Sequence, residues 1–152
     1  MTIQELEGLL INCSGLSDDE VEPLGRRCWS DCYTDDGRVQ EAYAHDGESV
    51  YFFPDRFDHA FFTSSNPARH PDAKDMIDRV RIERMRWIGI VIAGQVRGSF
   101  CIDAPPAGSQ RTRKRIYMVP EARYIVWLNQ RKDGGYIFST AYVATDNHFH
   151  TV

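Results

Sequence analysis

Arginine and lysine gather in the second part of the chain, and they are the residues best suited to chemistry on phosphate groups. Arg84 falls in the middle of an apolar stripe, where a guanidinium is expected only if it is paired or functional, and Arg81 falls at the edge of this stripe. The densest positive run contains Arg111, Arg113, Lys114 and Arg115. Because the guanidinium fork matches phosphate oxygens, these cations are candidate contacts to a nucleic-acid backbone. The alternatives are a solvated loop for the run and a structural ion pair for Arg84.

Hydroxyl groups accompany these cations on two segments that alternate as strands do. The first, 124–129, follows Arg123 and presents Ile125 and Trp127 on one face. The second, 136–144, is predicted to carry on one face Tyr136, Phe138, Thr140 and Tyr142. Hydroxyls beside arginines could orient a phosphodiester through directional hydrogen bonds. The alternative is an ordinary, half-exposed sheet face.

His59 is the candidate proton shuttle, because an imidazole titrates near neutral pH. Its aromatic neighbours fit a core histidine equally well. A metal site built on His59, His148 and His150 is the least favoured alternative, since a terminal His-Phe-His is more often a packing element. We therefore predict neither a metal nor a cofactor.

The charge of the chain is unevenly distributed. The net charge of −4 in 152 residues divides into −10 for residues 1–60 and +6 for residues 61–152. The basic part favours a polyanion partner, and the acidic part is interpreted as a shield or a partner surface. The alternative is two solvated surfaces that partly neutralise each other.

The compartment is predicted from the N-terminus and the cysteines. The chain starts without a positive segment or a long apolar run, so neither a signal peptide nor a membrane span is expected. The four cysteines form no CxxC pair, and we interpret them as reduced and mostly buried. A cytoplasmic protein without membrane association is expected.

The elements that must position these residues indicate an α+β fold in one domain, 1–152. The N-terminal part, 1–48, is acidic and predicted to be helical, and 49–145 is the expected core. Ser17 and Glu20 have the spacing of a capping box. Helices are predicted at 3–11, 18–33, 38–45, 55–62 and 72–93. After a short β-type run at 50–53, four strands of an antiparallel sheet are predicted at 96–102, 115–119, 124–129 and 136–144.

Three strings resemble a known family: Arg79 to Arg84 with Trp87-Ile88, Arg123 to Leu128, and Phe138 to Tyr142. They resemble the phage and polymorphic-toxin branch of the barnase/EndoU/colicin/RelE-like (BECR) nucleases, over about residues 50–145. The resemblance implies N-terminal helices packed on a four-stranded antiparallel sheet. It also implies a small endoribonuclease of phage or toxin type that cleaves RNA without metal, through attack of the ribose 2′-OH on the adjacent phosphate. An inhibitor or immunity protein would be a further partner of such an enzyme.

Roles for individual residues follow from the resemblance. His59 would be the general acid or base, and Arg81 or Arg84 would stabilise the transition state, with Arg123 assisting. Thr140 and Tyr142 would orient the phosphate. The alternative function is a binding module of the same fold, without catalysis, that holds nucleic acid or an acidic protein.

Overall fold

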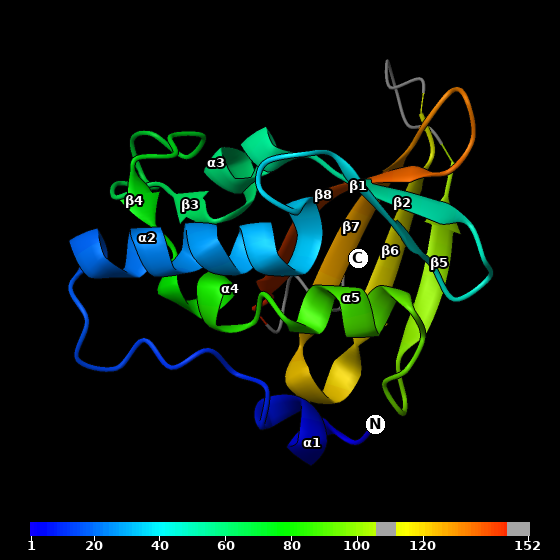
Figure 1. Ribbon diagram of the computed structural model, residues 1–152, viewed down its shortest axis with the longest axis horizontal. Helices are drawn as coiled ribbons and strands as arrows, with labels where there is room; N and C mark the ends of the chain where they lie inside the picture. Colours follow the sequence, from blue (N-terminus) through cyan, green and yellow to red (C-terminus); the bar gives the residue numbers. More distant parts are fainter. Residues whose placement is uncertain (106–111, 146–152) are drawn as a thin grey trace.

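A six-stranded mixed sheet organises the chain, with helices gathered in front of it in Figure 1. The computed structural model describes residues 1–105 and 112–145. The strands lie in the order β1-β2-β8-β7-β6-β5, with bounds β1 Gln40–Tyr43, β2 Ser49–Phe52, β5 Phe100–Ala104, β6 Lys114–Val119, β7 Tyr124–Gln130 and β8 Tyr136–Val143. A separate two-stranded sheet pairs β3 (Phe62–Thr63) with β4 (Met76–Ile77). The predicted α+β class is confirmed.

The strands expected in the second half of the chain form an antiparallel meander, β5 to β8. The turn into β8 contains Gly134 and Gly135, whose φ angles of +98° and +75° favour glycine. A Cβ added to Gly135 would lie 2.7 Å from the carbonyl oxygen of Ser49. This turn therefore requires glycine where it approaches β2.

The sheet is larger than predicted, so the expectation of a four-stranded antiparallel sheet is wrong. β2 pairs in parallel with β8 through Val50–Tyr136 and Tyr51–Ile137, which makes the sheet mixed. Residues 38–45, predicted to be helical, contain β1 instead, because the turn through Gly47 folds this segment back onto β2 as an antiparallel hairpin. The acidic N-terminal part thus supplies an edge strand of the same sheet.

The two N-terminal helices begin at capping boxes. Thr2 caps α1 (Ile3–Glu7), and Ser17 with Glu20 caps α2 (Asp18–Trp29), as the sequence predicts. α2 continues into a π-helical turn, η1 (Ser30–Thr34). This turn carries Tyr33 into the core, where its ring stacks at 4.6 Å on Phe52 of β2.

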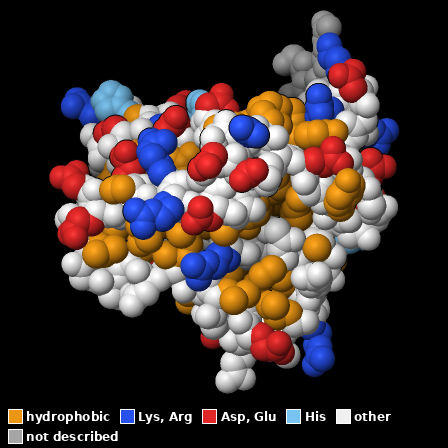
Figure 2. All heavy atoms as spheres, viewed as in Figure 1, with side chains coloured by type: hydrophobic (Ala, Val, Ile, Leu, Met, Phe, Trp, Pro, Cys, Tyr) orange, Lys and Arg blue, Asp and Glu red, His pale blue; other side chains and the backbone are white. Residues whose placement is uncertain are grey.

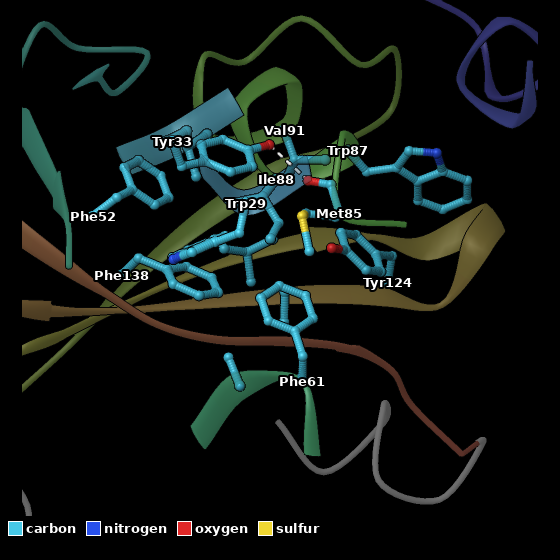
Figure 3. Packing of buried hydrophobic residues seen from close by; sticks show 14 of the residues in the cluster. Trp29, Tyr33, Phe52, Phe61, Met85, Trp87, Ile88, Val91, Tyr124 and Phe138 are labelled. Carbon is cyan, nitrogen blue, oxygen red and sulfur yellow. Dashed lines mark hydrogen bonds between the residues drawn. The ribbon is translucent and has the colours of Figure 1, made fainter. Parts of the chain in front are cut away.

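The long helix predicted at 72–93 is broken. Its first part contains β4, and two short helices follow, α4 (Arg79–Glu83) and α5 (Trp87–Ile92). Asp78 caps α4 by accepting a hydrogen bond from the Arg81 amide at 3.1 Å. At the break, the Tyr33 hydroxyl donates to the Met85 carbonyl at 2.6 Å (Figure 3). The same hydroxyl accepts from the Gly89 amide at 3.0 Å. A side chain from another element thus replaces backbone hydrogen bonds that a continuous helix would make.

The main core fills the space between the helices and one face of the sheet. Trp29 lies at its centre, with ring centroids 5.1 to 5.8 Å from those of Tyr33, Phe52, Phe61 and Phe138 (Figure 3). α2 approaches closely here, since a Cβ at Gly25 would lie 2.9 Å from the Ile82 side chain. We call this sheet face the helix-covered face. No helix in the described part of the chain is long and apolar enough to span a membrane.

The acidic and basic parts of the sequence are interleaved in space. Asp18 of α2 pairs with Arg79 of α4 at 2.9 Å, and Asp46 pairs with Arg115 of β6 at 3.0 Å. Figure 2 shows acidic and basic side chains interspersed over the helices. Part of the −10 charge of residues 1–60 therefore neutralises part of the +6 charge of residues 61–152.

Replacing Tyr33 with phenylalanine tests the bridge at the helix break. Tyr33→Phe removes a hydroxyl that satisfies the buried Met85 carbonyl and the partly buried Gly89 amide, so the free energy of unfolding should fall by about 2 kcal/mol. Urea unfolding measures this loss. The matched control is Tyr43→Phe, at a side chain that is 61% exposed, which should change stability by less than about 0.5 kcal/mol. Equal effects of the two substitutions would show that the bridge does not stabilise the fold.

Candidate nucleic-acid interface

An irregularity in β8 decides which side chains share a face. Trp127 of β7 lies opposite Thr140, but the next residue, Leu128, lies opposite Phe138, so Ser139 is an extra residue in β8. The bulge moves Thr140 and Tyr142 to the opposite face from Phe138, which is buried in the main core. The prediction that Tyr136, Phe138, Thr140 and Tyr142 share a face is therefore wrong, because strict alternation ends at Ser139.

The face that receives Tyr142 has its own small apolar cluster, and we call it the outer face. Its buried members are Ile116, Met118, Ile125 and Ala144, with Ala104, Trp127 and Tyr142 packed against them. Among the described residues, every member of this cluster belongs to a strand or follows one, whereas the buried helix residues belong to the main core. The helices of the described chain thus leave the outer face to the strands.

Trp127 and Tyr142 form the centre of a hollow on the outer face. The Trp127 indole N–H donates to the Tyr142 hydroxyl at 3.0 Å, and the Lys114 ammonium lies 5.5 Å from the Trp127 ring centroid. We call the adjoining cavity of about 190 Å³ the strand-face pocket, which is lined by Lys114, Trp127, Asn129, Ser139, Thr140 and Tyr142. Burial raises the pKa of Tyr142, which keeps its hydroxyl protonated at neutral pH.

Two arginines, Arg56 and Arg81, contact β8 next to this pocket, and we call them, together with the nearby Lys74, the cation group. Arg56 of η2 (Pro54–Arg56) donates to the Ser139 carbonyl at 2.6 Å and to its hydroxyl at 3.3 Å. Arg81 lies over the Tyr142 ring, 5.3 Å from its centroid. The bulge therefore brings both the pocket and the cations to the same stretch of β8.

The cations of this group repel one another, although an aspartate lies near each of them: Asp78 near Arg81 and Lys74, Asp72 near Lys74, and Asp55 near Arg56. Arg81 pairs with Asp78 at 3.3 Å and donates to the Ala60 carbonyl at 3.1 Å. Burial lowers the pKa of Lys74, and the nearby charges of Arg81 and Arg56 lower it further. Burial also lowers the pKa of Arg56. A bound anion would relieve this mutual repulsion, so the arrangement favours a phosphate or another oxyanion.

His59 lies at the margin of this region. It is exposed on α3 (Phe57–Ala60). The residue after His59, Ala60, accepts the hydrogen bond from Arg81 through its carbonyl. Arg56 precedes His59 by three residues on continuous helical turns, so both side chains face the same side. Among the described residues, no hydrogen bond or ion pair holds the imidazole, so its orientation is left open.

The contacts of Arg84 favour the structural role over the phosphate contact that the sequence also allowed. Its guanidinium donates to the Val80 carbonyl at 3.1 Å and lies 5.2 Å from the Trp87 ring centroid. Glu83 lies 3.7 Å away. The structure therefore places Arg84 against the helical segment that it belongs to, and none of these contacts joins it to the strand-face pocket.

The positive run 111–115 divides between the two faces. Lys114 lines the strand-face pocket, whereas Arg115 points to the helix-covered face, between Asp46 and Asp103 and over the Tyr136 ring at 4.4 Å. The Arg115 side chain is only 6% exposed and its charge is neutralised. Arg113 is exposed before β6, and Arg111 lies outside the described residues.

Arg123 lies at the opposite end of β7 from Asn129. It follows η3 (Pro120–Ala122) in a left-handed conformation with φ of +53°. Of the predicted site residues, the structure thus brings together Arg81, Lys114, Thr140 and Tyr142. Sequence reasoning missed Arg56, Lys74 and Asn129, since only tertiary packing and the bulge bring them here.

A second cavity, of about 210 Å³, lies between His45, the segment that follows α5, and strands β5 and β6. The His45 ring nitrogen Nδ1 is 2.7 Å from the Tyr117 hydroxyl there, and Cys101 lines the same cavity. Burial raises the pKa of Cys101, which makes the thiol a poor nucleophile.

The described residues contain no group of three or more His, Cys, Asp or Glu that could hold a metal ion. His148 and His150 lie outside the described residues.

Comparisons with protein-family models, with curated proteins and with solved structures find no match to this chain. The functional argument therefore depends on the geometry of the site.

The pair of the exposed Asp46 with the buried Arg115 predicts a pH dependence of stability. The hydrogen bond from Arg115 lowers the pKa of Asp46 below its ordinary 3.8. This stabilisation is present above that value and is lost as the pH falls through the lower pKa of the folded state. Asp46→Asn should therefore be less stable than the parent at pH 7, and the difference should shrink below pH 3.8.

Urea unfolding at neutral and acidic pH measures the effect of Asp46→Asn. The exposed turn substitution Asp133→Asn is the control and should leave both curves unchanged. A difference between Asp46→Asn and the parent that stays constant with pH would contradict the assigned role.

Proposed function

We propose that this protein binds RNA along the edge of β8 and on the outer face, and that it cleaves the bound strand as a small, metal-independent endoribonuclease. The observation that supports this proposal is the convergence of the cation group with Tyr142, Thr140 and Trp127. Cations would hold the phosphates, hydroxyls would orient them, and the indole would stack on a base.

The proposed reaction is a transesterification. A base removes the proton of the ribose 2′-OH, and the oxygen attacks the adjacent phosphorus. A 2′,3′-cyclic phosphate forms while the bond to the 5′-oxygen breaks, and an acid returns a proton to that leaving oxygen. Arg81 and Arg56 would stabilise the additional negative charge on the phosphate oxygens, because preorganised cations act most strongly where charge develops.

Two side chains could transfer the protons. His59, on the same side of the helical turns as Arg56, would be the base. Lys74 would be the acid, since its lowered pKa makes its ammonium a better proton donor than an ordinary lysine. Thr140 and Tyr142 would hydrogen-bond the phosphate from the side of the sheet.

A second candidate function is RNA binding without cleavage. The observation in its favour is that no described residue fixes the His59 ring, whereas a catalytic histidine normally has an orienting partner. Asp78 is paired with Arg81 and is not a free base. Both functions share the same binding surface.

Incubation of the purified protein with total RNA and with transfer RNA, with and without EDTA, separates the two functions. Cleavage that persists in EDTA and leaves 2′,3′-cyclic phosphate ends supports the endoribonuclease. Retardation of RNA on a gel without cleavage supports the binding protein. Absence of both cleavage and retardation would overturn the proposal.

Arg81→Ala should lower the rate of cleavage by about 10²-fold, because it removes a cation from the reacting phosphate. Arg97→Ala is the matched control, since Arg97 is exposed in the loop before β5. Thermal unfolding of both variants separates a loss of activity from a loss of fold. Equal rates for the folded Arg81→Ala and Arg97→Ala proteins would contradict the role of Arg81.

A further inference from the structure

The strand-face pocket contains polar groups that the cleavage reaction does not require. Lys114 of β6 and Asn129 of β7 lie directly opposite each other across the strand pair, at one end of the pocket. Thr140 lies opposite Trp127 across the next pair. The pocket therefore has an aromatic centre, with an ammonium and an amide at one end and hydroxyls at the side of β8.

These groups match the face and the edge of a single nucleobase. The indole of Trp127 offers a surface for base stacking. Asparagine makes a bidentate contact with N6 and N7 of adenine, and lysine donates to O6 and N7 of guanine. Both contacts use N7, an acceptor that pyrimidines lack. The pair Lys114 and Asn129 thus favours purines as a class.

We infer that the strand-face pocket binds a purine base and makes the protein select purine nucleotides, with Asn129 and Lys114 reading N7 and Trp127 stacking on the ring. This inference rests on the proposed function for its RNA ligand. Tyr142 connects the two sites, because its hydroxyl accepts from Trp127 while its ring lies under Arg81. A nucleotide could place its base in the pocket and its phosphate on the cation group at the same time.

Free adenosine tests the pocket without any RNA strand. Trp29 and Trp87 are 3% and 2% exposed, whereas Trp127 lines the pocket, so adenosine should quench mainly the fluorescence of Trp127. Trp127→Phe should abolish this quenching while the protein stays folded by circular dichroism. Uridine and 7-deazaadenosine, which lack N7, should bind at least about fivefold more weakly than adenosine. Equal binding of the three nucleosides, or no binding, would overturn the inference.

Oligonucleotides test the same pocket together with the cation group. The probes are 2′-O-methyl hexamers of adenosine, 7-deazaadenosine and uridine, which cannot undergo attack by the 2′-oxygen. Fluorescence anisotropy should show the adenosine hexamer binding about tenfold more tightly than the other two. Asn129→Ala should weaken binding of the adenosine hexamer and leave the uridine hexamer unchanged. Gln130→Ala, at the neighbouring position on the other side of β7, should change neither.

The two experiments separate the two proposals. Quenching by adenosine without binding of any hexamer would support the pocket and overturn the RNA-binding function. Equal binding of the three hexamers would support the function and overturn purine selection. A uniform loss of affinity for all hexamers in folded Asn129→Ala would also overturn the inference, because it would show that Asn129 contacts the backbone.

Discussion

The Tyr33 hydroxyl is the interaction on which the arrangement of the helices depends. It forms hydrogen bonds with the carbonyl of Met85, which lies in the break between α4 and α5, and with the amide of Gly89 in α5. Because the helix is broken there, α4 can bring Arg81 over Tyr142 while α5 packs on β6 and β7. Burial raises the pKa of Tyr33, so the hydroxyl keeps the proton that it donates to Met85. A π-helical turn in one element thus sets the geometry of a distant cation.

Local signals predicted much of the fold. The capping box of Ser17 and Glu20 places the start of α2, and the glycines before β8 place the last turn of the meander. The failures occurred where distant contacts overrule local pattern. The apolar stripe of 72–93 has helical spacing throughout, but a hydroxyl 52 residues away from Met85 stabilises the break. The parallel pairing of β2 with β8 joins residues that share no local signal.

The candidate site shows the same contrast between local sequence signals and contacts with distant residues. Arg81, Lys114, Thr140 and Tyr142 could be chosen from residue type, and the structure brings them together. The functional roles of these residues and of His59 stay predictions. Arg84 and Arg115 have the same chemistry in the sequence, but one lies on Trp87 and the other lies between two aspartates. Nothing in their neighbouring residues distinguishes them, because the partners that neutralise Arg115 come from other strands and turns.

Arg56 has a consequence for the behaviour of the sheet in solution. β2 pairs with only the first part of β8, so no described strand pairs with the later part, which contains the Ser139 carbonyl at the bulge. An open edge can add a strand from another molecule and so begin aggregation. The guanidinium of Arg56 occupies the Ser139 carbonyl, and the positive charge along this edge repels a second copy of the same strand. We therefore expect the residues proposed to attract a polyanion to disfavour assembly through β8 as well.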